Sequence, residues 1–228
     1  MSIKAFYQKV VTCNNKECAG FAVHDKKNGY MPRAFQWSST IPCDILVVSK
    51  NPGHPLKQES YKGKDGHQLL NEYMSFRKKV IKVFYNSNDP SARFTRNMRR
   101  YLRYFLGIDM ELKQYQDYHF MIKDDHELFR RVAFTNLYKC STKKESGKIP
   151  TDMFENCFNK LFVEELEIYK PKVVLAAGNE VYNFLKHRIK YPIVKVKHFT
   201  YFYPKKDEVK ILKNLKLNVL KLMKVLDE

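Results

Sequence analysis

The sequence lacks the features that mark membrane, secreted and nucleotide-binding proteins. No apolar run approaches the roughly 20 residues that span a bilayer, and the N-terminus has no apolar signal segment. With only 8 glycines, the chain contains neither G-x-G-x-x-G nor G-x-x-x-x-G-K, which argues against a generic nucleotide-binding protein. Internal repeats, low-complexity tracts and Pro/Gly-rich linkers are also missing. We therefore expect a soluble, intracellular protein with no membrane partner.

Acidic residues are scarce relative to basic ones. The chain has 24 Asp and Glu against 42 Lys and Arg, which gives a formal net charge of +18. Such a field attracts phosphate backbones and makes binding fall with added salt. The other interpretation is a lysine-rich surface that is merely solvated. We favour a polyanionic partner.

Length and composition predict one folded domain over residues 1–228. The hydrophobic share of 44%, with 14% aromatic residues, belongs to a chain that can bury a core. We divide the domain into an N-terminal cysteine-bearing segment (1–40), a body and a C-terminal amphipathic helix (207–228). The stripe on that helix is Leu212, Leu215, Val219, Leu222 and Leu226. We expect a monomer.

Short apolar runs alternate with helical patterns along the body. The runs are compact and mostly aliphatic, as in strands buried on both faces: 45–48, 132–137, 173–177 and 193–196. The helical patterns cover 68–84, 91–106, 151–169 and 179–187. This alternation implies crossover connections, and it predicts a three-layer α/β/α fold around a mainly parallel four-stranded sheet.

Four residues follow the ends of these predicted strands. Asn51 comes after the first, Asn136 ends the second, Gly178 follows the third and His198 follows the fourth. Ligands of open α/β sheets bind beyond the carboxyl ends of the strands. Each residue also has a plain structural interpretation, as a turn former, a strand cap or a surface histidine. Their shared position favours a common site.

The order and spacing of these motifs resemble the uracil-DNA glycosylase superfamily, from Cys13 to about Pro204. D-I-L-V-V-S-K-N-P-G (44–53) resembles its first motif, a strand running into G-x-(D/N/A)-P-(G/Y). T-N-L-Y-K-C (135–140) and P-K-V-V-L-A-A-G (171–178) are similar to segments of the thermophile-type family 4 enzymes. H-F-T (198–200) stands where the superfamily has its H-P-S motif.

The resemblance implies a role for each of these residues. Asn51 would hold the attacking water, since an amide is no strong base. His198 would donate a hydrogen bond to uracil O2 as negative charge develops there. Asn136 would read the uracil edge with its amide and carbonyl, and Lys50 and Gly53 would line the same pocket.

The resemblance also points to a stacking ring for the extruded base. E-x-Y-x-G-x-x-G (59–66) resembles the family stretch that carries a stacking phenylalanine, which indicates Tyr61. The spacing requires gaps and the ring has changed. A partly exposed loop tyrosine is an equal alternative.

Four cysteines match the order of a family 4 iron-sulfur site. Cys13 and Cys18 precede the first motif, whereas Cys140 and Cys157 follow the T-N segment. The resemblance implies a [4Fe-4S] cluster that pins distant loops together and takes no redox part in base excision. The first pair departs from the family in being spaced C-x4-C. Zinc and four buried thiols remain alternatives, because thiolates suit both metals and cysteine also packs as a core residue. Cys43 is left over as a core thiol.

Two further segments are candidates for DNA contact. Arginines recur at helical spacing, so that a helix with Arg96 and Arg100 on one side would grip phosphates or be a solvated face. Phe202 or Tyr203, in the basic and aromatic segment after His198, would enter the duplex where the flipped base leaves a gap. Burial of these rings in the core is the competing interpretation.

We therefore predict a monofunctional glycosylase that flips uracil or a related deaminated base out of DNA, removes it by water attack and leaves an abasic site. No lysine is evidently placed as a Schiff-base nucleophile. The alternative is a non-catalytic DNA-binding or damage-sensing protein of the same fold. Ser49, Lys50 and Phe199 motivate it, since the family usually has Gly, Glu and Pro at these positions.

Overall fold

The computed structural model describes residues 2–13, 41–52, 68, 70–72, 75, 90–118, 125–141 and 148–224. Gly53, Tyr61 and Cys18 lie outside these ranges, and so does most of the helix expected over 68–84. Gln68, residues 70–72 and Ser75 are helical. None of the described helices is long and apolar enough to cross a membrane.

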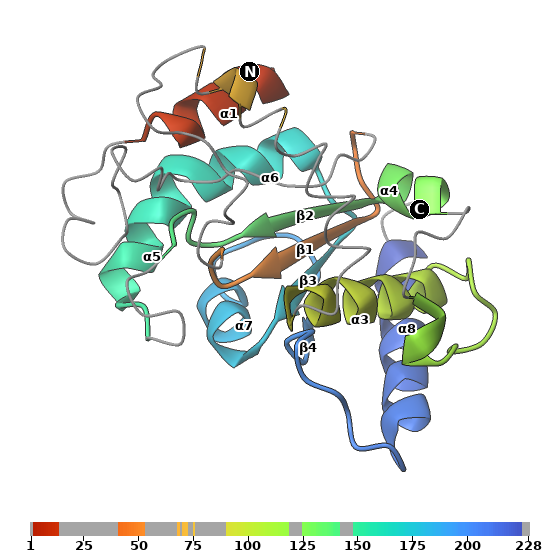
Figure 1. Cartoon of the computed structure of the whole chain (residues 1–228). Helices are drawn as coiled ribbons and strands as arrows, with labels where there is room; N and C mark the ends of the chain where they lie inside the picture. The colour runs from red at the N-terminus through yellow and green to blue at the C-terminus, as the bar shows by residue number, and fades with distance from the viewer. Residues whose placement is uncertain are drawn as a thin grey trace.

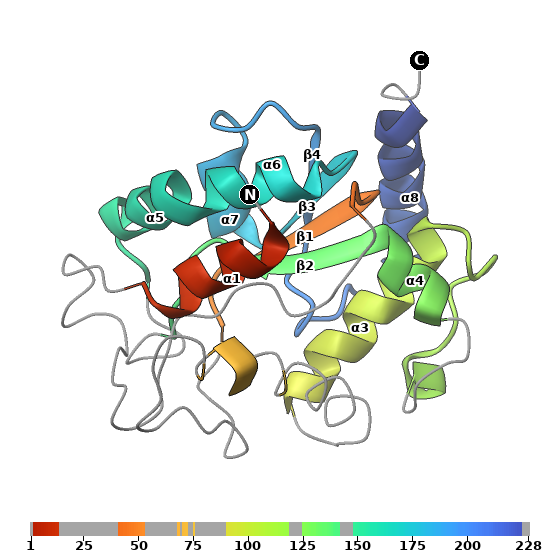
Figure 2. The same cartoon turned by 90° about the horizontal axis from the view of Figure 1, so that it is seen from above.

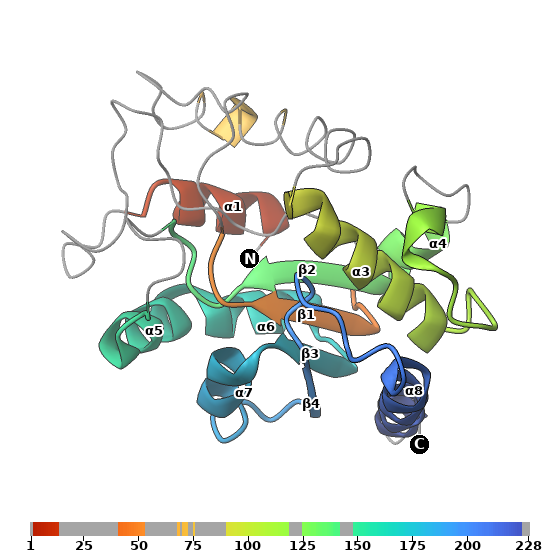
Figure 3. The same cartoon turned by 60° about the horizontal axis from the view of Figure 1, so that its bottom comes forward.

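Four parallel strands form the central sheet. They are β1 (Ile45–Ser49), β2 (Val132–Asn136), β3 (Val173–Ala177) and β4 (Ile193–Val196). The order across the sheet is β2-β1-β3-β4, and each neighbouring pair is parallel. Figure 3 shows the strands in this order from top to bottom. Every residue of β1, β2 and β3 is buried, as their continuous apolar runs predict.

Helices on both sides of the sheet confirm the three-layer α/β/α prediction. On one face lies α3 (Pro90–Phe105), with α8 (Glu208–Lys224) beside it. The other face carries α6 (Val163–Tyr169), against which α1 (Ile3–Val11) packs through a Tyr7–Tyr169 hydroxyl contact of 3.1 Å. Figure 1 shows these two groups of helices on opposite sides of the strands, and Figure 2 shows α1 beside α6 from above.

The remaining helices complete one core. The predicted helix over 151–169 is α5 (Thr151–Cys157), a π-helical segment η4 (Phe158–Phe162) and α6 without a break. Next along the chain, α7 (Asn179–Leu185) places Phe184 against Phe154 and Phe158, with ring centroids 5.4 and 5.7 Å away. Buried side chains from α1 to α8 belong to a single apolar cluster.

Three elements of the described chain were not expected from the sequence. They are α1, the 3-10 turn η3 (Tyr115–Tyr118) and α4 (Asp125–Arg131). The helix α1 begins at a Ser2 cap whose Oγ accepts from Ala5 N at 3.2 Å. Both η3 and α4 are held to α3 by buried charges, described below.

The predicted stripe on α8 is partly correct. Leu212 and Val219 are fully buried, whereas Leu215 and Leu222 pack at the edge of the core. Met223 is buried as well. Leu226 lies beyond the described residues.

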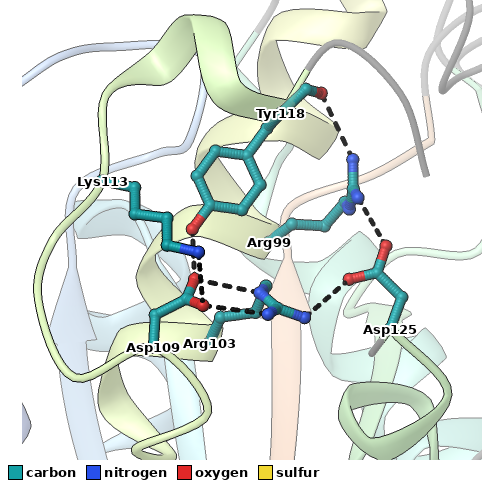
Figure 4. A network of polar contacts seen from close by, with 6 residues as sticks. All are labelled: Arg99, Arg103, Asp109, Lys113, Tyr118 and Asp125. Carbon is teal, nitrogen blue, oxygen red and sulfur yellow. Dashed lines mark hydrogen bonds and ion pairs between the residues drawn. The ribbon is translucent and has the colours of Figure 1, made fainter. Parts of the chain in front are cut away.

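A network of buried charges fastens η3 and α4 to α3 (Figure 4). Arg103 donates two hydrogen bonds of 2.9 Å to Asp109 and one of 3.2 Å to Asp125. Arg99 also pairs with Asp125, and the hydroxyl of Tyr118 donates to Asp109. The four charged side chains are at most 4% exposed. Such burial is tolerated because each carboxylate faces at least one guanidinium.

Candidate active site at the carboxyl ends of the strands

The ends of β1 and β2 are locked together beyond the last strand residues. Ser49 and Asn136 are partners in the register of the two strands. The pairing continues into the loops, because Leu137 N donates to Ser49 O at 2.8 Å and Tyr138 N donates to Lys50 O at 2.9 Å. The structure therefore brings the segment that carries Lys50 and Asn51 next to Asn136, as expected from the sequence.

Asn51 is half-buried at the start of the loop after β1. Its Nδ2 donates to Pro52 O at 3.0 Å. This bond restrains the amide and fixes which way its oxygen faces. An amide held in this manner can position a polar ligand, but it cannot take a proton at neutral pH.

The ends of β3 and β4 are joined in a similar way. Gly178 N donates to Val196 O at 2.9 Å, and Gly178 has a φ of +101°, which only glycine adopts without strain. A Cβ placed on Gly178 would lie 3.9 Å from the Cβ of His198. The close approach places His198 beside the end of β3, one strand away from its own.

The ring of His198 is half-buried against α3. Its centroid lies 5.3 Å from that of Phe94, and its Nδ1 lies 2.9 Å from Thr200 Oγ1. Burial, followed by the positive charge of Lys50, lowers the pKa of His198 below its usual 6.5. The ring is therefore neutral at pH 7 and carries one N–H to donate.

Phe199 belongs to the core and not to the mouth of the site. It is 0% exposed, with its ring 5.4 Å from Phe94 and 6.0 Å from Tyr101 between centroids. Its carbonyl accepts from Asn97 Nδ2 at 2.8 Å. The phenylalanine that replaces the expected proline thus anchors the segment after β4 to α3, and it leaves His198 in place.

Glu180, which the sequence patterns did not single out, contributes a charge beside the first loop. Its Oε2 lies 2.7 Å from Lys50 Nζ, and both side chains are partly exposed. Glu180 stands in the first turn of α7, directly after Gly178 and Asn179. In the sequence, this position of Glu180 just after the strand-end glycine is the one feature that could have indicated a role in the site.

A buried ion pair behind Asn136 was also missed. Lys139 and Glu165 are both 0% exposed, and their Nζ and Oε2 atoms are 2.5 Å apart. The helix pattern indicated that Glu165 is buried, because this residue falls on the same stripe as the apolar residues 158, 161, 162, 166 and 169. A carboxylate on that stripe must be buried, and must therefore be paired.

The structure differs from the exposed arginine side predicted for α3. Arg96 is 5% exposed and its guanidinium lies 5.4 Å from the ring centroid of Tyr115. Arg100 is 4% exposed; it donates to both carboxylate oxygens of Glu208, at 3.0 and 2.8 Å. The sequence does not show that these arginines have partners on distant elements. On α3, Arg93 is exposed.

The segment after His198 presents aromatic rings to solvent. Tyr201 is 62% and Phe202 is 41% exposed. The Phe202 ring packs against the ring of Tyr115 in an edge-to-face arrangement, with centroids 5.2 Å apart. By contrast Tyr203 is half-buried, and its hydroxyl accepts from Lys197 N at 2.9 Å. Of the two rings singled out in the sequence, Phe202 is the more available.

The cysteines fall into two groups. Cys43 is fully buried before β1, and burial raises its pKa to about 12, so it is a neutral core thiol as expected. Cys140 and Cys157 are buried and Cys13 is half-buried. No three His, Cys, Asp or Glu side chains within the described ranges are grouped as metal ligands. Cys18, the fourth predicted ligand, lies outside those ranges.

Most of the chain matches a known protein family. The family model described as the uracil DNA glycosylase superfamily matches residues 38–218. That range contains all four strands and every described residue of the strand-end site. A search of curated proteins found no match.

Proposed function

The chain belongs to the uracil DNA glycosylase superfamily, and from this premise we propose that it hydrolyses the N-glycosidic bond of uracil, or of a related deaminated base, in DNA. The product would be an abasic site, with no strand cleavage. One observation carries the proposal: Lys50, Asn51, Asn136 and His198 stand at the ends of the parallel strands of one sheet. That edge is where open α/β sheets bind their ligands.

Asn51 would hold the attacking water. Bond cleavage leaves positive charge on the sugar, and water attacks the face opposite the departing base. The amide donor of Asn51 is bonded to Pro52 O, so its oxygen is the group that would accept a hydrogen bond from this water. Because an amide does not ionise, the water would be positioned rather than deprotonated.

His198 would stabilise negative charge on the leaving base. In the tautomer that this role requires, Nδ1 would accept from the Thr200 hydroxyl 2.9 Å away, and the neutral ring would carry its proton on Nε2. That N–H would donate to uracil O2 as charge develops in the transition state. The lowered pKa of His198 supports this role, since a neutral donor is available across the physiological range.

Asn136 would read the edge of the extruded base. A side-chain amide held in one orientation would accept from N3–H and donate to O4 of uracil, whereas cytosine presents an acceptor and a donor in the reverse order. Lys50 would line the same pocket, together with Gly53 and the stacking ring of Tyr61, which lie outside the described residues. The exposed Phe202 would fill the gap left in the duplex, with Tyr203 bracing its loop.

DNA would approach over the aromatic and basic segment after β4. Lys197, Lys205 and Lys206 are exposed in this segment, and Lys195 is exposed on β4 itself. Arg93 adds an exposed charge, with its guanidinium 5.9 Å from the Phe202 ring centroid. The burial of Arg96 and Arg100 moves the proposed phosphate contacts from that side of α3 to these residues.

We further propose a [4Fe-4S] cluster on Cys13, Cys18, Cys140 and Cys157, with a structural zinc as the alternative. The thiolate donor set fits either metal. The C-terminal end of α1, the segment after β2 and α5 lie on the same side of the molecule, which supports this grouping. The bound group would tie these segments together. Iron and sulfide in anaerobically purified protein are expected; a colourless zinc protein would overturn the choice of cluster.

The assay uses uracil-containing single- and double-stranded oligonucleotides, followed by alkali to cleave abasic sites. We expect product with the wild type and large losses in Asn51→Ala and His198→Ala. The matched controls are Asn183→Ala and His187→Ala, which change exposed residues of the same types on or just after α7. Parallel reactions with hypoxanthine, xanthine and mismatched thymine define the base. Equal product from wild type and both site variants would refute the assigned roles.

A non-catalytic DNA-binding role is the second candidate. Its support is that Ser49 and Lys50 stand where the superfamily usually has Gly and Glu, and that Lys50 is paired with Glu180. The same assay decides between the two. Tight binding of uracil-containing DNA without any abasic product would favour the second candidate.

A further inference from the structure

We infer that the buried Lys139–Glu165 pair is a positioning device that fixes the end of β2 and, through it, the orientation of Asn136. The inference rests on the proposed function, in which Asn136 reads the base. Lys139 and Glu165 do not touch the base themselves. They act from the opposite face of the sheet.

The pair makes a closed set of contacts around the end of β2. Lys139 Nζ donates to Glu165 Oε2 at 2.5 Å, to Thr135 Oγ1 at 2.7 Å and to Asn136 O at 2.6 Å. These three bonds use all three protons of the ammonium group. Thr135 Oγ1 in turn lies 2.8 and 2.9 Å from the two carboxylate oxygens of Glu165 and donates to that group. The ion pair therefore restrains the last two residues of β2, Thr135 and Asn136.

The alternation of side chains places this device behind the site. Neighbouring residues of a strand point to opposite faces of its sheet. Phe134 meets Phe94 of α3, with centroids 5.5 Å apart, whereas Thr135 meets Glu165 of α6. Asn136 therefore shares the α3 face with Phe134, and this is the face on which His198 contacts Phe94. The ion pair holds the backbone of Asn136 while leaving its amide free to face the site.

A contribution to the stability of the folded state does not by itself explain why a buried ion pair stands here. Removing two charges from water costs about as much as their attraction returns, so that apolar residues of similar size often stabilise a core as well or better. Lys139 also packs against the ring of Phe162, with Nζ 5.4 Å from the centroid, in an environment that apolar side chains would fill. What an apolar replacement cannot supply is a directed bond to Asn136 O and Thr135 Oγ1.

The test compares neutral variants of a buried and an exposed pair. Lys139→Met with Glu165→Gln removes both charges but keeps the size of the side chains, so the fold should survive. The matched control is Lys9→Met with Glu164→Gln, an exposed pair of 2.5 Å that joins α1 to the same helix. Thr135→Val, which removes the hydroxyl, is compared with Thr135→Ser, which keeps it.

Two readouts are measured on each variant. The first is the single-turnover cleavage rate beside the affinity for undamaged duplex, because misplacement of Asn136 should slow the chemistry by about 10- to 100-fold without weakening DNA binding. The second is hydrogen exchange at the amides of Leu137 and Tyr138, which bond to the end of β1. We expect faster exchange there in the buried-pair variant and in Thr135→Val, with the control pair and Thr135→Ser like wild type.

The outcomes separate the two levels of the proposal. A wild type that cleaves none of the bases refutes the proposed function, and the exchange measurement then decides the positioning role by itself. A folded buried-pair variant with wild-type exchange at Leu137 and Tyr138 overturns the positioning role whatever the activity. An active wild type whose buried-pair variant cleaves at the same rate overturns it as well.

Discussion

The pKa of one side chain, His198, is lowered by two causes of different kinds. Burial against α3 is the larger cause of its lowered pKa, and the ammonium group of Lys50 is the second. In the unfolded chain the ring regains its usual pKa of about 6.5. The unfolded state therefore binds more protons between the two pKa values, and His198 makes the protein less stable as pH falls through that window.

Lys50→Met should raise the pKa of His198 while leaving it below the usual value. The charge of Lys50 disappears, but the burial of the ring persists. An NMR titration of the His198 ring protons measures the change. Lys186→Met, which removes an exposed lysine just after α7, is the control. An unchanged pKa would show that Lys50 does not act on the ring.

The residues that sequence patterns identified are those whose positions follow from strand ends. Asn51, Asn136 and His198 could be placed together because parallel strands bring their carboxyl ends to one edge. The partners of Glu165 and Glu180 could not be identified, since Lys139 and Lys50 lie far away in sequence. Pairing across such distances depends on the tertiary fold, which local patterns do not specify.

Among the helices, α3 shows most clearly how sequence patterns can mislead. Its arginines repeat at helical spacing, which predicts a solvent-facing basic side. In the structure Arg99, Arg100 and Arg103 are buried because Asp109, Asp125 and Glu208 come from outside the helix to meet them. The bounds of α3 were predicted to within a residue, whereas the burial of its arginine side was not.

Asp125→Asn should lower the free energy of unfolding by about 3 to 5 kcal/mol, because it leaves two buried guanidinium groups without this counter-ion. Asp125 pairs with both Arg99 and Arg103 and is 0% exposed (Figure 4). Urea denaturation measures the loss. The control is Asp117→Asn, an exposed residue of η3 whose carboxylate accepts from Gln114 N. Similar midpoints for the two variants would contradict the role of the network.

Asp109 of the same network makes the stability of the folded state depend on pH in the acid range. Burial opposes the ionisation of Asp109, but hydrogen bonds from Arg103 and Tyr118 outweigh it and lower its pKa below 3.8. A carboxylate with a lowered pKa stabilises the folded state above its unfolded value and loses that contribution as pH falls through the folded one. The contacts of Asp109 with Arg103 and Tyr118 are therefore fully stabilising above the usual pKa of an aspartate and are lost only as pH falls below it.

At the scale of the whole molecule, the excess of 18 positive charges acts in two ways. Part of it is local, on the exposed lysines beside Tyr201 and Phe202, and part is spread over surfaces such as α8. Only lysines that touch phosphates release counter-ions on binding, and these set the dependence of affinity on salt. The spread charge would steer DNA toward the protein without fixing its position.

Lys205→Glu with Lys206→Glu should weaken DNA binding and reduce the slope of log affinity against log salt by about two, since each phosphate that a lysine neutralises adds roughly 0.9 to that slope. Lys213→Glu with Lys221→Glu on α8 changes the net charge equally, at exposed sites away from that segment. Fluorescence anisotropy over a salt series measures both. Equal slopes for the two pairs would show that the overall field, and not local contact, governs binding.

The architecture as a whole was predictable for a simple physical reason. Strands buried on both faces read as continuous apolar runs, and alternation with helices leaves a parallel sheet as the natural arrangement. Helices such as α1 and α4 escaped prediction because they are short and are stabilised by tertiary contacts more than by their own pattern.

The π-helical segment from Phe158 to Phe162 determines which way the residues of α6, including Glu165, face. A turn with i→i+5 bonds accommodates one residue more than an α-helical turn. Deleting the exposed Lys160 would therefore convert this turn into an ordinary α-helical turn and leave the residues after it facing as before. Glu165 would keep its contacts with Thr135 and Lys139. The loss of one residue from the α-helical turn between this segment and Glu165 would instead rotate Glu165 by about 100° and leave Lys139 buried without its counter-ion.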